Sequence, residues 1–237
     1  MIRLSKKPLE GIRVIDSSYV FAGPYATGLL GDLGAEVIKV EPPGKGDPLR
    51  TWRGMHGDTS LWWYVQNRNK KSVTLDISKP AGQKLVRELA LKSQVLIENY
   101  KVGTLEKYGL GYADLEKINL GLVYCSITGF GQTGPYGHKG GFDIVAQGMS
   151  GIMDLTRAGE VPFKTGISIC DVVGGQFALA AILGALECRE RTGAGQFLDL
   201  GSVPNAQLPP ILREMDVAVF PNRGEGGTNL VAMECMA

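Results

Sequence analysis

The chain has 237 residues, of which 44% are hydrophobic and 21% charged, which suffices for one sizeable hydrophobic core. Its 25 Lys and Arg residues nearly balance 24 Asp and Glu residues, which argues against a nucleic-acid-binding protein, because such proteins normally carry an excess of basic residues. No apolar stretch approaches the ~20 residues that a membrane-spanning helix needs, and the N-terminus has no apolar leader segment, so we expect a cytoplasmic protein without a membrane partner.

Neither the cysteines nor the histidines form a pattern that indicates a metal site. The four cysteines are Cys125, Cys170, Cys188 and Cys235. They include no CxxC pair and most lie in apolar sequence, so we expect reduced thiols. The two histidines, His56 and His138, are isolated in loop-like sequence. We therefore expect no metal site and no histidine-based catalytic triad.

The first elements alternate between strand and helix. An apolar run at residues 12–16 predicts a short buried strand. Gly23-Pro24 predicts the start of a helix through about Leu33, because proline fits the first helical turn, and residues 36–40 predict a second strand. Strand, helix and strand at this spacing indicate a parallel βαβ unit. Residues 42–69 are rich in turn-forming residues, and we expect them to be irregular.

The alternation continues along the chain. Further strands are predicted at 72–77, 94–98, 121–128 and 197–200. Helices are predicted from the Ser78-Lys79-Pro80 start to about Lys92 and from Val172 to Arg191, with shorter helical segments near Thr104, Tyr112 and Asp143. The sum is an α/β fold with an open, mostly parallel, Rossmann-like sheet flanked by helices.

The pattern changes near Gly201. A proline pair follows, then a strand-like run at 217–220, a glycine-rich loop and a helical pattern that reaches Ala237. We therefore expect one domain over residues 1–200 and a short strand–loop–helix tail over residues 201–237.

Asp171 is the most informative single residue. It lies in the glycine-framed, apolar run GISICDVVGG, directly before the predicted helix. A carboxylate is rarely buried without a partner, because its desolvation costs several kcal/mol. Asp is also a preferred helix N-cap residue. This segment alone leaves two interpretations open, a helix cap or a carboxylate kept reactive for chemistry.

The segments that follow the strands predict a ligand-binding edge, because open α/β sheets bind ligands beyond the carboxyl ends of their strands. These segments are Ser17–Pro24, Glu41–Asp47, Asp76, Asn99–Gly103 and Thr128–Pro135, with Lys45, Arg50, Arg68, Lys70, Lys71, Lys101 and Lys107 nearby. Any one segment is explained equally well as an ordinary turn, but their succession favours a large, anionic, partly aromatic ligand such as a nucleotide derivative. The first predicted strand leads to SSYVFAGPYATG instead of GxGxxG, and the chain contains no GxxxxGK[ST], so a dinucleotide or P-loop site has little support.

Several blocks of sequence resemble the class III coenzyme A (CoA) transferases, a family that also includes the α-methylacyl-CoA racemases. The blocks, from about Pro8 to Leu200, are PLEGIRVIDSSYVFAGPYATGLLGDLGAEVIKVEPPGKGDPLR, NRNKKSVTLDI, VLIENYKVGTLEKYGLGY, YCSITGFGQTGP, GISICDVVGG and ERTGAGQ. The resemblance is strongest to transferases that act on glutarate, succinate or related dicarboxylates. It implies that residues 1–200 are the large, CoA-binding domain, without the second domain of the family, and that relatives form interlocked homodimers.

The resemblance also implies roles for individual residues. Asp171 corresponds to the nucleophile, which would form an anhydride with the acyl group and then an aspartyl-CoA thioester. The positions that hold CoA correspond to Ala22, Leu75, Asn99, Tyr100, Lys107, Thr128, Gly129, Phe130 and Gly131. The substrates would be an acyl-CoA and a small carboxylate, with no permanently bound cofactor.

Three positions depart from the pattern of the family. Lys107 stands where an arginine often contacts phosphate, so the charge is kept but the bidentate geometry is lost. Pro42 stands where some members have another arginine. Phe142 stands where the racemases carry a histidine that acts as a second acid/base, which favours CoA transfer over racemisation.

The tail supports different interpretations. Residues 213–237 resemble a fragment of a retaining glycosyltransferase, so a sugar-nucleotide-binding module is one alternative. An inactive fragment, truncated or joined from two unrelated coding sequences, is another.

Overall fold

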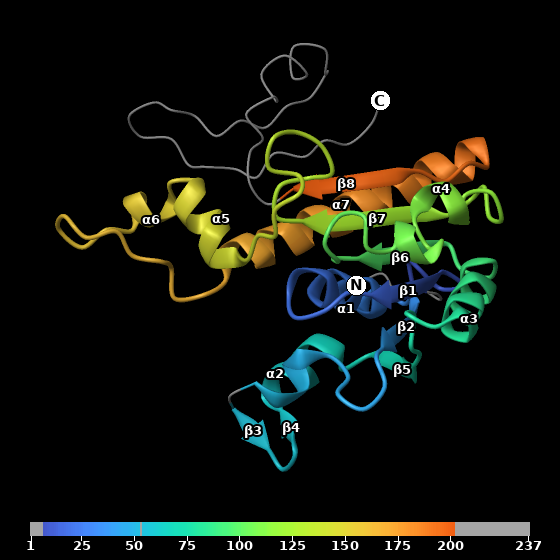
Figure 1. Cartoon of the computed structure of the whole chain (residues 1–237), viewed down its shortest axis with the longest axis horizontal. Coiled ribbons are helices and arrows are strands. Elements are labelled where there is room, and N and C mark those ends of the chain that lie inside the picture. The colour runs from blue at the N-terminus through green and yellow to red at the C-terminus, as the bar shows by residue number, and fades with distance from the viewer. Residues whose placement is uncertain (1–6, 53, 202–237) are drawn as a thin grey trace, which may run out of the picture.

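The computed structural model describes residues 7–52 and 54–201, so the predicted strand–loop–helix tail, apart from Gly201, lies outside the described residues. Six parallel strands form one sheet in the order β5-β2-β1-β6-β7-β8 (Figure 1). The strands are β1 (Arg13–Ser17), β2 (Glu36–Glu41), β5 (Lys70–Thr74), β6 (Val95–Glu98), β7 (Val123–Thr128) and β8 (Phe197–Gly201). The predicted α/β fold with an open, parallel sheet is confirmed.

The order of the strands reverses between β1 and β6. From β1 the chain moves outward through β2 to β5, then returns to β6 beside β1 and continues through β7 to β8. Such a reversal leaves a crevice beyond the carboxyl ends of the two central strands, because the connections leave in opposite directions. The topology alone therefore directs attention to the segments after β1 and β6.

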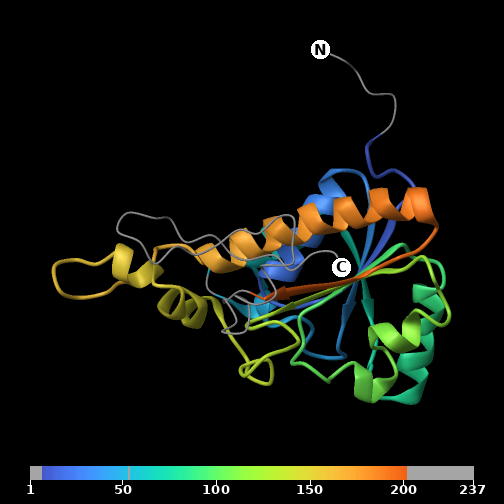
Figure 2. The same cartoon turned by 90° about the horizontal axis from the view of Figure 1, so that it is seen from above.

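Helices cover both faces of this sheet (Figure 2). They are α1 (Ala22–Asp32) and α7 (Ile169–Thr192) on one face, and α3 (Pro80–Ala90) and α4 (Tyr112–Leu115) on the other. Successive residues of a strand point to opposite faces. Val14 accordingly belongs to the apolar cluster under α1 and α7, whereas Ile15 belongs to the cluster under α3 and α4. Both faces are thus buried, as expected for a parallel sheet.

The segment over residues 42–69, which the sequence predicts to be irregular, contains regular structure. It holds the 3-10 helix η1 (Pro48–Thr51), the hairpin of β3 (Met55–His56) and β4 (Thr59–Ser60), and α2 (Leu61–Asn67). The side chain of Ser60 accepts a hydrogen bond from the backbone N–H of Trp62 and so caps α2. The prediction missed α2 because its aromatic residues are weak helix formers, although the Ser60 cap was present as a signal.

Two further boundaries are corrected. Strand β5 covers residues 70–74 instead of 72–77, because its pairing with β2 begins at Lys70. Helix α3 has Lys79 as its N-cap residue and ends at Ala90, and Ser78 does not cap it. Ser78 instead donates from its hydroxyl and its backbone N–H to Asp76, which closes a turn before the helix.

Helix α7 begins at Ile169, three residues before the predicted start. It is long and apolar enough to cross a membrane by length and composition, which corrects the expectation that no stretch approaches this limit. Its buried residues pack against α1 and the sheet, and the core helix of a soluble protein passes the same test.

Short helices fill the remaining connections. The 3-10 helix η2 (Glu106–Tyr108) lies between β6 and α4, and α5 (Asp143–Met149) and α6 (Ile152–Leu155) lie between β7 and α7. Helices α5 and α6 project beyond the sheet beside the first turn of α7 (Figures 1 and 2). The chain therefore brings α5 to the same end of the molecule as the carboxyl ends of the strands.

Candidate active site

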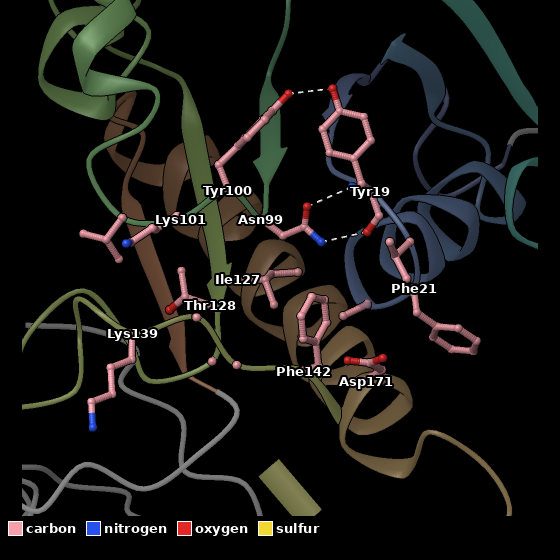
Figure 3. A pocket seen from close by; sticks show the side chains of 16 residues that line it. Tyr19, Phe21, Asn99, Tyr100, Lys101, Ile127, Thr128, Lys139, Phe142 and Asp171 are labelled. Carbon is pink, nitrogen blue, oxygen red and sulfur yellow. Dashed lines mark hydrogen bonds between the residues drawn. The ribbon is translucent and has the colours of Figure 1, made fainter. Parts of the chain in front are cut away.

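A cavity of about 320 Å³ lies at the crevice that the strand order predicts. Four groups of residues line it, and they lie between β1 and α1, after β6, at the end of β7, and before α5 (Figure 3). Their members are Tyr19, Val20, Phe21, Ala22, Asn99, Tyr100, Lys101, Val102, Ile127, Thr128, Gly129, Lys139, Gly140, Gly141 and Phe142. Asp171 from the first turn of α7 completes the lining.

Asp171 reaches the cavity because α7 crosses α1 closely. A Cβ atom on Gly175 would lie 2.8 Å from the backbone oxygen of Ala22 and 2.8 Å from the ring of Tyr25. Only a glycine at this position permits such an approach without displacement of the neighbouring backbone. The contact brings the first turn of α7 beside the first residues of α1, and Asp171 lies one helical turn before Gly175.

Of the two interpretations that the sequence leaves open for Asp171, the helix cap is wrong. The N-cap residue of α7 is Ser168, and it makes no side-chain cap hydrogen bond. Asp143 acts on the first turn instead, because its Oδ1 atom accepts a hydrogen bond of 2.9 Å from the backbone N–H of Cys170. Gln147 donates to the other oxygen of Asp143 at 2.6 Å and holds that carboxylate in place. Asp143, on a neighbouring helix, thus caps α7 and leaves the Asp171 carboxylate available.

The surroundings of Asp171 favour its protonated form more than water does. Burial, and to a smaller extent the negative charge of Asp143, raises the pKa of Asp171 from 3.8 to about 6. No hydrogen bond joins Asp171 to another residue that lines the cavity (Figure 3). The carboxylate is therefore ionised at neutral pH but weakly solvated, which is how a carboxylate becomes a better nucleophile.

The wall of the cavity between β1 and α1 is held by residues from β6. The side chain of Asn99 accepts a hydrogen bond from the Tyr19 backbone N–H and donates one to the Tyr19 carbonyl, both at 2.8 Å (Figure 3). The hydroxyl of Tyr100 donates to the hydroxyl of Tyr19 at 2.7 Å. On its outer side the wall contacts α2, where the ring of Trp62 packs edge-on against Phe21 with 5.6 Å between centroids.

Two glycines allow the remaining loops to meet. A Cβ atom on Gly129 would lie 2.5 Å from the Cα atom of Gly141, and one on Gly141 would lie 2.8 Å from the Cα atom of Gly129. The loop after β7 therefore crosses the loop before α5 backbone to backbone. Next to this crossing, Phe130 is buried with Ala146 and Cys170, which ties α5 and α7 to the end of the sheet.

The structure brings six of the ten predicted site residues together around the cavity. These are Ala22, Asn99, Tyr100, Thr128, Gly129 and Asp171. The other four do not line it. Leu75 packs against the apolar cluster under α3 and α4, Lys107 is exposed on η2, and Phe130 is buried behind the Gly129 crossing. Gly131 has a φ of 76° and forms the turn that follows.

Most of the cations predicted at the ligand-binding edge lie elsewhere, and only Lys101 of that group lines the cavity. Arg50 pairs with Glu41 and stacks on Trp63, and Arg68 pairs with Asp32. Lys71 pairs with Glu36 at the amino end of β2. Lys70 is buried and donates to Asp16 at 2.9 Å. The sequence correctly predicted that these cations lie near the strands, but it gave no information on which end of a strand or which face of the sheet each cation occupies.

Tyr19, Val20 and Lys139 also line the cavity, and the sequence did not single them out as site residues. Tyr19 and Val20 belong to a segment that was predicted at the edge. Lys139 comes from the far end of the connection between β7 and α5, beyond the residues 128–135 that were predicted at the edge, and its only signal was the Gly140-Gly141 pair that follows it. In residues 7–52 and 54–201, no group of three or more His, Cys, Asp or Glu side chains could hold a metal ion.

Comparisons with known proteins identify the family. The model of the family described as CoA-transferase family III matches residues 9–218. The chain belongs to this family. Over 197 residues it is 48% identical to a mouse protein named succinyl-CoA:glutarate CoA-transferase, which covers 82% of this chain and 45% of the mouse protein. Over 229 residues it is 43% identical to succinyl-CoA–D-citramalate CoA-transferase of Chloroflexus aurantiacus, which covers 91% of this chain and 57% of that protein.

A solved structure agrees with this membership in CoA-transferase family III. The crystal structure of a CaiB/BaiF family protein from Brucella suis is 44% identical, with a TM-score of 0.79 over 83% of this chain and 53% of that one. The predicted resemblance to class III CoA-transferases and the α/β fold are therefore confirmed. The chain spans about half the length of the curated relatives it matches, 45% and 57% in the two named above.

Proposed function

We propose that this chain carries the CoA-binding half and the nucleophile of an enzyme that transfers CoA from an acyl-CoA to a free carboxylate. The observation that carries the proposal is the position of Asp171, a partly buried carboxylate with a pKa raised to about 6, at one end of the cavity. Lys101 and Lys139 lie at the opposite end (Figure 3). A CoA thioester has a reactive carbonyl at one end and phosphates at the other, which matches this distribution of charge.

The chemistry follows from an ionised, weakly solvated carboxylate. In the first step an oxygen of Asp171 attacks the thioester carbonyl, the C–S bond breaks, and CoA leaves as a thiolate, so that a mixed anhydride forms. The thiolate then attacks the Asp171 carbonyl of the anhydride and expels the donor carboxylate, which leaves an aspartyl-CoA thioester.

The acceptor carboxylate repeats the sequence in reverse. It attacks the aspartyl thioester, releases the CoA thiolate and forms a second anhydride, and the thiolate attacks the acyl carbon that came from the acceptor. The product is a new acyl-CoA, and Asp171 returns as a carboxylate. No step needs a proton donor, because both leaving groups, a thiolate and a carboxylate, can depart as anions.

The relatives favour dicarboxylates as substrates, since the mouse protein is named for succinyl-CoA and glutarate and the Chloroflexus protein for succinyl-CoA and citramalate. Phe142 lines the cavity beside Asp171, so the cavity holds one acid/base group there instead of the two that a racemase needs. We therefore propose transfer and not racemisation.

The proposal also covers the organisation of the protein. Residues 1–200 would form the CoA-binding domain, and the tail over 201–237 stays a separate prediction. A relative named as an alpha subunit, succinyl-CoA–L-malate CoA-transferase of Chloroflexus aurantiacus, supports assembly into oligomers, and we propose a homodimer. CoA and acyl-CoA would be substrates and not resident cofactors, and the cytoplasm stays the proposed location.

Hydroxylamine trapping tests the proposal. Succinyl-CoA and hydroxylamine are added to the chain, and peptide mass spectrometry is used to detect a hydroxamate on the side chain of Asp171. We expect the hydroxamate in the wild-type chain and in Asp76→Asn, which changes an aspartate in the turn before α3, and we expect none in Asp171→Asn.

Each outcome of this experiment has a separate meaning. A hydroxamate in Asp171→Asn would show that another residue is the nucleophile. Saturable binding of CoA in calorimetry without any hydroxamate would show that the chain binds CoA but is an incomplete enzyme. Saturable binding of a UDP-sugar without binding of CoA would favour the glycosyltransferase alternative.

A further inference from the structure

The wall of the cavity between β1 and α1 contains an unfavourable backbone conformation. Val20 has a φ of 66° and is the one non-glycine residue with positive φ in the part of the chain that the structure describes. A β-branched residue is particularly disfavoured in this left-handed region, because its Cβ atom crowds the backbone. Such a conformation persists only where the surrounding structure imposes it, and Val20 lines the cavity between Tyr19 and Phe21.

Side chains from distant parts of the chain hold the backbone on both sides of Val20. Asn99 holds both backbone polar groups of Tyr19, and the ammonium of Lys39 donates to the Ser18 carbonyl. The N–H of Val20 itself donates to the Oδ1 atom of Asp47 at 3.2 Å. Asp47 follows β2 and is fully buried, yet it does not line the cavity.

The side chain of Asp47 is itself held by two further contacts, one to Leu49 and one to Lys39. Its Oδ1 atom also accepts a hydrogen bond of 2.9 Å from the Leu49 N–H, which caps η1. Its Oδ2 atom lies 3.0 Å from the ammonium of Lys39, and both side chains are fully buried. Lys39 in turn lies 3.7 Å from Asp16 at the end of β1. The Asp47 carboxylate therefore has little freedom to move, because any displacement would leave its charge, or that of Lys39, buried without a partner.

We propose that Asp47 is a positioning residue, which holds the wall formed by Tyr19, Val20 and Phe21 in its left-handed form so that it faces Asp171. The cap on η1 needs only the bond to Leu49, so the second bond to Val20 is an additional use of the same oxygen. A carboxylate suits this use because a charged acceptor forms a stronger bond with a backbone N–H than a neutral one. The inference stands on the contacts of the loop, and only its kinetic consequence rests on the proposed function.

Hydrogen–deuterium exchange tests the proposal without any ligand. In Asp47→Ala the peptide that spans Tyr19 to Phe21 should exchange at least about tenfold faster than in the wild-type chain, because the N–H of Val20 loses its acceptor and the residue relaxes. Asp76→Ala is the matched control, since Asp76 accepts a bond from the N–H two residues later, as Asp47 does, but lies away from the cavity. Asp47→Asn should restore protection, because its amide oxygen can still accept.

A second substitution separates positioning from general loosening. Glycine adopts positive φ without penalty, so in Val20→Gly the left-handed conformation at position 20 no longer needs Asp47 to hold it. The Asp47→Ala substitution should therefore accelerate exchange less in a Val20→Gly background than in the wild-type background. Two results would overturn the proposal. One is equal acceleration of exchange at residues 19–21 in both backgrounds with unchanged far-UV circular dichroism. The other is an exchange rate at these residues in Asp47→Ala that equals that of the wild-type chain.

Loss of Asp47 alone leaves Lys39 with a weaker partner, so a paired variant guards against unfolding. Asp47→Ala combined with Lys39→Met removes both charges, and exchange at residues 19–21 should be faster than in Lys39→Met alone, which is the control because Lys39 also donates to the Ser18 carbonyl. Wild-type protection there would contradict the proposal.

The kinetic consequence is a rate of hydroxamate formation at Asp171 that is about 10- to 100-fold lower in Asp47→Ala, with CoA affinity changed less. An unchanged rate would refute positioning toward Asp171. Accelerated exchange in Asp47→Ala, together with a wild-type chain that neither binds CoA nor forms a hydroxamate, would support the positioning role of Asp47 and refute the proposed function instead.

Discussion

Two carboxylates on opposite sides of the wall between β1 and α1 have opposite electrostatic surroundings. Asp16 is fully buried, and burial alone would raise its pKa, but Lys39, Lys70 and the Ser18 hydroxyl outweigh burial and lower that pKa well below its ordinary value. Asp171 is less buried, yet its burial, joined by the negative charge of Asp143 and offset by no cation, raises its pKa to about 6. The difference shows that the charges beside a buried carboxylate, more than the extent of its burial, decide whether its pKa is lowered or raised.

The largest effect expected from this comparison is on stability. Asp16→Ala leaves Lys70, and in part Lys39, without a counter-charge in the interior, so we expect unfolding to become easier by about 3–5 kcal/mol. Urea denaturation at pH 7 measures this. Asp76→Ala, which removes an exposed carboxylate from the turn before α3, should cost much less, because that carboxylate has no buried cation as a partner. An equal loss in the free energy of unfolding in the two variants would mean that the buried ion pairs of Asp16 stabilise the fold no more than the exposed Asp76 turn does.

Next in size is the effect of a side chain at the backbone crossing of Gly129 and Gly141. In Gly129→Ala the new Cβ atom meets the backbone of Gly141, so the two loops must separate and the cavity changes shape. We expect CoA affinity, measured by calorimetry, to fall about tenfold or more. Gly140→Ala is the control, because a Cβ atom there meets nothing within 4 Å. A similar loss in both variants would show that the crossing itself is unimportant.

The raised pKa of Asp171 predicts a dependence of the first chemical step on pH. In the proposed mechanism only the ionised carboxylate attacks, so hydroxamate formation should be constant well above pH 6 and fall about tenfold for each pH unit below it. Asp143→Asn keeps an oxygen that can accept from the Cys170 N–H but removes the neighbouring charge, which should move the fall to lower pH. A fall centred near pH 4 in the wild-type chain would contradict the raised pKa.

The smallest expected effect is a gain in stability. The folded pKa of Asp171 exceeds its unfolded value, so this group stabilises the fold only at low pH and that contribution is lost as pH rises through about 6. Asp171→Asn removes the penalty, and we expect Tm at pH 7 to rise by roughly 2–4 °C. The gain should vanish near pH 4, where Asp171 is protonated in the folded chain. Differential scanning calorimetry at both pH values measures the two Tm shifts.

The sequence predicted β1, β2, β6, β7 and β8 well, because each is rich in apolar residues and bounded by turn residues. The predicted bounds of β5 were wrong, because this strand has little apolar sequence. The sequence missed α2, whose aromatic residues favour other structures when considered without the Ser60 cap. It also left open whether Asp171 caps α7, whereas Asp143 from another helix accepts the hydrogen bond from the first turn of α7. Local patterns do not contain such contacts, because they depend on where α5 lies relative to α7.

The candidate site follows the same division. Residues directly after β1, β6 and β7 could be predicted, since a parallel sheet places the carboxyl ends of its strands together. Lys70 shows the limit of this reasoning. It lies near Asp16 in the structure and is buried, but its sequence context is that of an exposed lysine next to a turn. Whether a cation faces a ligand or a buried carboxylate is decided by packing.

The crossing of Gly129 and Gly141 bears on how the substrate range of such an enzyme can diversify. Where two loops touch backbone to backbone, no side chain can be added between them, so this part of the cavity has one shape for any sequence that keeps the crossing. Variation in the acyl group must then come from positions whose side chains project into the cavity, and Phe21 and Phe142 are two that border Asp171. Efforts to redirect specificity should therefore randomise these two phenylalanines and leave the glycines untouched.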